Sequence, residues 1–306
     1  MNRLLIKQPL NIKVSKEECI EDLACLFHEL KESYGMYDYF GEEKFETAFQ
    51  NIIDHLDNET NFEFEKTIHN LKNELDFIKD GHFSLGDSEE ACVEYDYAIR
   101  YSHYKGIPYI DCKKFYSDNE SEREQLEIFA KKGSEYINDE PLILDFRGNK
   151  GGSTHYIYSF LLGLLGVEDI GYSYKYVQRC SDLFLDYLRK ENYEWNPEEN
   201  VTTSEECHLP VSNKKKIYVL IDEYTASAAE EGIAYLKNIE NVTIVGEHSA
   251  GCGSCGNCIE FYLPNSHLKV YFGTGIVLYD GTINIDAEGG FKGDISYKYF
   301  EAILQN

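Results

Sequence analysis

The sequence has no long apolar run, few prolines and a marked shortage of basic residues. Its best apolar stretch, Phe160 to Val167, is far below the ~20 residues that a membrane-spanning helix needs. The apolar run near the N-terminus, Leu4 to Ile6, is too short for the core of a signal peptide. These absences predict a soluble protein of the cytoplasm that does not insert into membranes.

Acidic residues outnumber basic ones by 55 to 29, which gives a formal net charge of −26. Most of such a surface would repel nucleic-acid phosphates and anionic lipid headgroups, so we expect neither nucleic acid nor a membrane as a partner. Six prolines and 23 glycines in 306 residues, with 42% apolar residues, exclude collagen-like and disordered classes. Nine cysteines, an odd number, predict mostly free thiols in a reducing compartment.

The first 80 residues show a helical pattern. Apolar side chains recur at spacings of three and four within 20–34, 45–56 and 64–78, which predicts three amphipathic helices. Beyond residue 80, short β-type runs alternate with helical patterns, as is typical of an α/β core. We therefore predict an N-terminal helical domain over 1–80 and an α/β domain over 81–306.

Residues 142–152 read as a buried strand that runs into a glycine-rich turn and then a helix. Glycines allow a close approach of the backbone, and N–H groups at such a turn can face an anion or an oxyanion. The alternative is a plain strand-to-helix turn with an Asp145–Arg147 pair. The turn matches neither GxxxxGK[ST] nor GxGxxG, which disfavours a nucleotide-phosphate loop, and we predict no cofactor.

A second strand, 217–222, also leads into a helix. Ser227 falls in the opening turn of that helix, where the helix dipole favours negative charge and the N–H of Ala228 is free to donate. This is the arrangement of a nucleophile with its own oxyanion donor. The alternative is a helix cap by Thr225 or Ser227, with Glu230 completing a capping box.

His82 follows Gly81 at the junction between the two predicted domains. A histidine in such a place can face a cleft and exchange protons near neutral pH. The alternative is a structural or exposed histidine with no role in chemistry.

Together these segments occur in the order that is typical of the tail-specific (carboxyl-terminal processing) serine peptidases, and the chain resembles that family over about 15–297. The family also holds the tricorn core proteases and interphotoreceptor retinoid-binding protein. The matching segments are Asp80-Gly-His82, Leu142 to Gly152, Thr225-Ala-Ser-Ala-Ala-Glu230, Val245-Gly-Glu247 and Glu288 to Ile295.

The resemblance implies a spiral α/β core of the ClpP and crotonase type, and a serine-type peptidase that works through an acyl-enzyme. Ser227 matches the nucleophile of the family. The N–H of Ala228 and the backbone of Gly151 and Gly152 match its oxyanion hole. The implied substrates are peptides or unfolded proteins, and the chain can form homo-oligomers. Its negative charge favours basic or neutral peptides.

The general base distinguishes two branches of the family. Tail-specific enzymes use a lysine about 25 residues after the nucleophile, where this chain has Cys252, and no Lys or Arg occurs from Asn238 to Leu268. The tricorn-like branch uses a histidine and a glutamate, which His82 and Glu288 match. That branch has a serine before the histidine, where this chain has Gly81.

Other candidate bases are His248 and Lys292, and Ser84 is a weak substitute for the serine that this chain lacks before His82. The gap between His82 and the strand at 142 is too short for the PDZ domain that tail-specific enzymes carry.

Cys252, Cys255 and Cys258 form a CxxCxxC pattern that, with His248 or Cys207, could ligate a metal. A glycine-rich loop with small residues is the favoured alternative, so we predict no metal site. A redox-sensitive loop is a third interpretation. Two functions therefore compete with the peptidase: a non-catalytic member of the family that binds a peptide or an apolar ligand, and a metal or redox module.

Overall fold

The computed structural model describes residues 2–87, 95–138, 141–279 and 290–305. The chain divides into two compact units, and each collects segments that are distant in sequence. Unit 1 comprises 1–90, 176–204 and 255–277, and unit 2 comprises 91–175, 205–254 and 278–306. This division differs from the boundary predicted at residue 80, because strands from the second half of the chain pair with the N-terminal segment.

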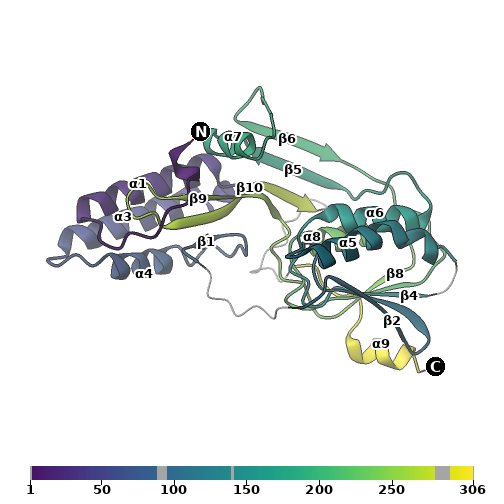
Figure 1. Ribbon diagram of the computed structural model, residues 1–306. Helices are drawn as coiled ribbons and strands as arrows, with labels where there is room; N and C mark the ends of the chain where they lie inside the picture. The colour runs from purple at the N-terminus through teal and green to yellow at the C-terminus, as the bar shows by residue number, and fades with distance from the viewer. Residues whose placement is uncertain (1, 88–94, 139–140, 280–289, 306) are drawn as a thin grey trace. The chain divides into compact units, whose positions relative to one another are not determined.

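Unit 1 begins with the three predicted amphipathic helices. They are α1 (Lys16–Ser33), α3 (Glu42–Asn58) and α4 (Phe64–Glu74), and they lie together at the N-terminal end of the ribbon (Figure 1). Their apolar stripes are buried, with Leu30 and Leu71 fully inaccessible to solvent. Within its described residues, unit 1 also contains the short helices η1 (Arg3–Leu5), α2 (Tyr37–Phe40) and α7 (Asp182–Lys190).

The sheet of unit 1 has the strand order β1-β10-β5-β6, and β9 pairs with β10. The strands are β1 (Ser84–Leu85), β5 (Tyr174–Arg179), β6 (Val201–Glu206), β9 (Cys255–Tyr262) and β10 (Lys269–Tyr279). The end of α1 lies against β10, where the N–H of Gly35 donates to the carbonyl of Gly273 at 2.9 Å. A Cβ on Gly35 would meet the backbone of Gly275 at 2.9 Å, so only glycine fits there.

Unit 2 is built on a five-stranded sheet in the order β2-β3-β4-β7-β8. The strands are β2 (Ile99–Tyr104), β3 (Ile107–Cys112), β4 (Leu142–Asp145), β7 (Ile217–Leu220) and β8 (Val242–Val245). β2 and β3 are antiparallel, whereas β3, β4, β7 and β8 are parallel neighbours. Every residue of β4 and β7 is buried, as expected for parallel strands with both faces covered.

Helices cover this sheet on both faces (Figure 1). One face carries α5 (Glu120–Lys132), α6 (Thr154–Leu165) and α8 (Ala228–Lys237), and the other carries α9 (Tyr297–Ile303). The short helix η2 (Gly133–Tyr136) packs against α6. Phe300 of α9 packs against Ile143 of β4 and Tyr218 of β7. The predicted α/β fold with an N-terminal helical segment is confirmed.

The central strands determine where the candidate site lies. β4 and β7 are parallel neighbours in which Asp145 pairs with Leu220, so both strands end at the same edge of the sheet. The loops that follow, 146–153 and 221–227, therefore lie side by side, which is where ligands bind in open α/β sheets. Within the described residues, no helix combines the length and the apolar character that crossing a membrane requires.

Candidate active site

Ser227 stands at a strained turn between β7 and α8. Its φ of 56° and ψ of −121° lie outside the regions that side-chain-bearing residues normally adopt. Such a conformation costs about 1–3 kcal/mol and persists only where the surroundings impose it. Here the N–H of Ala226 donates to the carbonyl of Asn149 at 2.8 Å, and the N–H of Ser227 donates to Glu230 at 3.0 Å. The turn leaves Ser227 half-buried at the start of the helix.

The glycine loop after β4 lies directly against this turn. A Cβ on Gly151, whose φ is +91°, would lie 2.7 Å from the nitrogen of Ala228 and 2.8 Å from the Cβ of Ser227. A Cβ on Gly152, with φ +129°, would lie 2.3 Å from the backbone of Phe115. Both positions therefore require glycine, and the structure brings together four predicted site residues, Gly151, Gly152, Ser227 and Ala228.

The predicted oxyanion donors differ in availability. The N–H of Gly151 donates to the side-chain oxygen of Asn149 at 2.8 Å. The N–H groups of Gly152 and Ala228 take part in no hydrogen bond within the described part of the chain. Ala228 is the first residue of α8, so its N–H has no acceptor inside the helix. Gly152 is exposed, and these two N–H groups are the ones that remain able to bind an oxyanion.

Glu230 joins the serine turn to the loop after β8. Its carboxylate is fully buried and accepts four hydrogen bonds. The donors are the N–H of Ser227 (3.0 Å), the hydroxyl of Ser249 (2.6 Å), the N–H of Gly251 (2.8 Å) and the thiol of Cys252 (3.4 Å). Burial raises the pKa of Glu230, although these hydrogen bonds oppose the rise. The sequence predicted Glu230 only as part of a helix cap and gave no sign that its carboxylate binds both the serine turn and the loop after β8.

The helix cap that the sequence offers as the alternative role of Thr225, Ser227 and Glu230 is therefore formed in part. Glu230 does accept from the N–H of Ser227, as a capping box requires. Thr225 does not cap α8: its hydroxyl bonds to the carbonyl of Phe146 at 2.9 Å and to Asp222 at 3.1 Å. The same contacts that cap the helix hold Ser227 in its strained conformation.

The position of the family lysine holds a thiol. The buried thiol of Cys252 donates to the carboxylate of Glu230, and Glu230 lies on α8 about one helical turn after Ser227. Of the other candidate bases, His248 places Nδ1 2.8 Å from the carbonyl of Ser249 and forms an isolated β-bridge with Lys292.

His82 lies in unit 1 with an acidic neighbour. The backbone N–H of His82 donates to Oδ1 of Asp80 at 2.9 Å, and the ring Nδ1 of His82 is 3.9 Å from the same oxygen. That Nδ1 is buried and has no hydrogen-bond partner within the described residues. Asp80 is itself buried and accepts from the hydroxyl of Tyr34 at 2.8 Å. The Asp-Gly-His spacing was the sequence signal for this pair.

The relation between His82 and Ser227 stays a prediction, because the two residues lie in different units. Glu288, the predicted partner of His82, lies outside the described residues.

The three clustered cysteines are divided between the units. Cys252 belongs to unit 2, whereas Cys255 and Cys258 lie on β9 in unit 1. Burial raises the pKa of Cys258 to about 12 and that of Cys255 well above its ordinary value, so both are protonated thiols. The described residues contain no group of three His, Cys, Asp or Glu side chains arranged to hold a metal.

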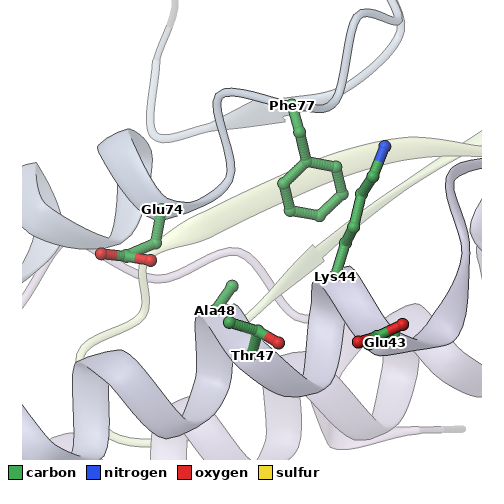
Figure 2. A pocket seen from close by; sticks show the side chains of 6 residues that line it. All are labelled: Glu43, Lys44, Thr47, Ala48, Glu74 and Phe77. Carbon is green, nitrogen blue, oxygen red and sulfur yellow. The ribbon is translucent and has the colours of Figure 1, made fainter.

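Two hollows lie elsewhere. One, of about 300 Å³, lies between α3 and the end of α4, where Lys44 stands over the ring of Phe77 (Figure 2). The other, of about 370 Å³, lies beside α9 in unit 2 and is lined in part by Arg147, which Asp145 binds through both carboxylate oxygens. Neither hollow is lined by Ser227 or His82.

A serine at a strained strand-to-helix turn, beside free backbone N–H groups, is the arrangement of hydrolases that form acyl-enzymes. The sequence model of peptidase family S41 matches residues 106–296, which is more than half of the chain. The chain therefore belongs to peptidase family S41, as its motifs predicted.

Solved structures show the same fold at low sequence identity. Mature CPAF superposes with a TM-score of 0.65 at 13% identity, covering 95% of this chain and 96% of that one. A putative peptidase from Parabacteroides merdae gives 0.57 at 15% identity, covering 96% and 98%. A lipoprotein from Streptococcus agalactiae gives 0.56 at 15% identity, covering 100% and 99%. A comparison with curated proteins finds no match.

Proposed function

We propose that the protein is a serine-type peptidase that hydrolyses peptide bonds in peptides or unfolded proteins, with Ser227 as the nucleophile. Membership of family S41 supports peptidase activity in general. The observation that carries the finer assignment is the strained Ser227 turn packed against Gly151, with the N–H of Ala228 free to donate.

In the proposed reaction, Oγ of Ser227 attacks the carbonyl carbon of the scissile peptide while its proton passes to a base. The N–H groups of Ala228 and Gly152 stabilise the negative oxygen of the tetrahedral intermediate. The intermediate collapses, the amine leaves with the proton from the base, and the acyl group stays on Ser227. Water then attacks the ester with help from the same base, which releases the carboxylate product.

His82 is the proposed base, and a carboxylate would hold its imidazole in the productive orientation. Glu288 is the residue that the family resemblance implies for this role. Asp80 is a second carboxylate suited to it, because its Oδ1 lies 3.9 Å from Nδ1 of His82.

A non-catalytic member of the family that binds peptides is the second candidate function. The observation that favours it is Cys252, a buried thiol at the place of the family lysine.

A fluorescent fluorophosphonate probe tests the proposal, because it labels only an activated serine. We expect labelling of the wild type that is lost in Ser227→Ala and in His82→Ala. Matched controls are Ser121→Ala and His103→Ala, which alter exposed residues of α5 and β2 and should label like the wild type. A wild type that stays unlabelled while a known serine peptidase reacts would favour the non-catalytic binder.

A further inference from the structure

A group of polar side chains on α8 begins one helical turn after the proposed nucleophile. Ser227, Glu231 and Tyr235 recur at four-residue spacing and are half-buried. The positions between them, 228–230 and 232–234, are buried. Residues four apart on a helix are neighbours, with Cβ atoms about 5–6 Å apart. Glu231 lies one helical turn after Ser227, and its backbone N–H donates to the carbonyl of Ser227 at 3.1 Å.

The carboxylate of Glu231 is only half engaged. Its Oε1 accepts from the hydroxyl of Tyr172 at 3.2 Å and from the hydroxyl of Tyr235 at 3.1 Å. Within the described part of the chain, no hydrogen bond reaches Oε2 and no cationic side chain pairs with Glu231. A half-buried carboxylate without a cation is costly to keep charged, and such groups gather at functional sites. Burial raises the pKa of Glu231, which a bound cation would reverse.

The ring of Tyr172, one of the two tyrosines that bind this carboxylate, packs among other tyrosine rings. The ring centre of Tyr172 lies 4.9 Å from that of Tyr235, 5.3 Å from that of Tyr279 and 5.2 Å from that of Tyr174. All of these residues belong to unit 2, which holds the first two residues of β5 and the last two of β10, as do Ser227 and Glu231. The faces of tyrosine rings attract cations, and aromatic cages with a carboxylate are a recurring solution for recognising ammonium groups.

We propose that Glu231, with Tyr172 and Tyr235, forms a subsite for a basic side chain, lysine or arginine, next to the scissile bond of the substrate. This inference rests on the proposed function, since it takes Ser227 as the reacting residue. It specifies the substrate class: peptides that carry a basic residue beside the bond to be cleaved. The acidic surface of the chain, with a formal net charge of −26, assists the approach of the same peptides.

Matched peptides test the subsite. One series carries lysine or arginine at each position around the scissile bond, and its partners carry norleucine or citrulline, which keep the length without the charge. We expect the wild type to cleave the basic peptides with a kcat/KM about tenfold or more higher at one position. Glu231→Gln should lose this preference and keep its rate on the neutral peptides. Glu223→Gln, which removes one exposed carboxylate from the preceding loop, should keep it.

Several outcomes would overturn the subsite. One is a wild type without preference for basic peptides, a measurement that needs no variant to fold. Another is an equal loss on basic and neutral peptides in Glu231→Gln, which would assign Glu231 a structural role.

If no peptide is cleaved, the proposed function fails separately, and binding decides the subsite. Fluorescence anisotropy then compares labelled lysine and norleucine peptides on Ser227→Ala and on Ser227→Ala combined with Glu231→Gln. Tighter binding of the lysine peptide that depends on Glu231 supports the subsite, and equal binding refutes it.

Discussion

Replacing Gly151 by alanine should damage both the stability of the protein and its proposed active site. The substitution forces alanine to adopt a φ of +91°, which costs an L-residue about 1–2 kcal/mol. The new methyl group would also lie 2.7 Å from the nitrogen of Ala228 and 2.8 Å from both the Cβ of Ser227 and the carbonyl oxygen of Ala226. Overpacking against such surroundings costs typically about 1–3 kcal/mol. The two effects together predict a loss of about 2–5 kcal/mol.

Gly106 provides the matched control, because it shares the unusual backbone without the crowding. Its φ is +82°, and a Cβ there would meet nothing within 4 Å. Gly106→Ala should therefore cost only the backbone part, about 1–2 kcal/mol. The difference between the two variants isolates the contact between the glycine loop and the serine turn.

Urea unfolding measures the free energy for both variants, and the fluorophosphonate probe measures the reactivity of Ser227. We expect Gly151→Ala to be the less stable variant by about 1–3 kcal/mol, and to label at least tenfold more slowly, because the methyl group displaces Ala228 and its N–H. Equal destabilisation by the two substitutions, with unchanged labelling, would refute the packing of Gly151 against the serine turn.

Three further perturbations follow from the same contacts. Glu230→Gln should lower the free energy of unfolding by about 2–4 kcal/mol, because an amide cannot accept all four hydrogen bonds. It should also slow the labelling of Ser227. Unchanged values in urea unfolding and in the probe assay would show that Glu230 does not hold the serine turn in place. Asp80→Asn should slow the labelling of Ser227, because that carboxylate would no longer orient His82. The matched control Asp76→Asn, at an exposed residue, should leave the labelling rate unchanged. Equal rates for the two variants would assign Asp80 no part in the site. In native protein at pH 8, iodoacetamide should modify the exposed Cys207 and spare Cys258, whose pKa is raised to about 12. Peptide mass spectrometry measures both modifications. Fast modification of Cys258 would show that burial does not suppress its thiolate.

The sequence alone was sufficient for features that depend on neighbouring residues. The three helices at 20–34, 45–56 and 64–78 follow from apolar spacing, because one helical face must be buried whatever it packs against. The two strand-to-helix turns follow from buried runs that end in glycine or small residues. The motifs in these turns were specific enough to predict the family.

Tertiary structure decided everything that joins distant parts of the chain. The N–H of Gly151, one of the predicted oxyanion donors, donates instead to the side chain of Asn149, and the glycine pattern in the sequence does not reveal this contact. Strands from 174–206 and 255–279 share a sheet with β1, which moves the division of the chain away from residue 80.

The contact of Glu231 with Tyr172, whose ring packs against that of Tyr279, is equally invisible in sequence. Spacing along the chain reports which side chains share one helix face or one strand face. It carries no information about which faces meet, because packing depends on the shapes of surfaces that form only after the chain has folded. The sequence thus determined the local elements and the family, and the folded core determined which of its polar groups remain available for chemistry.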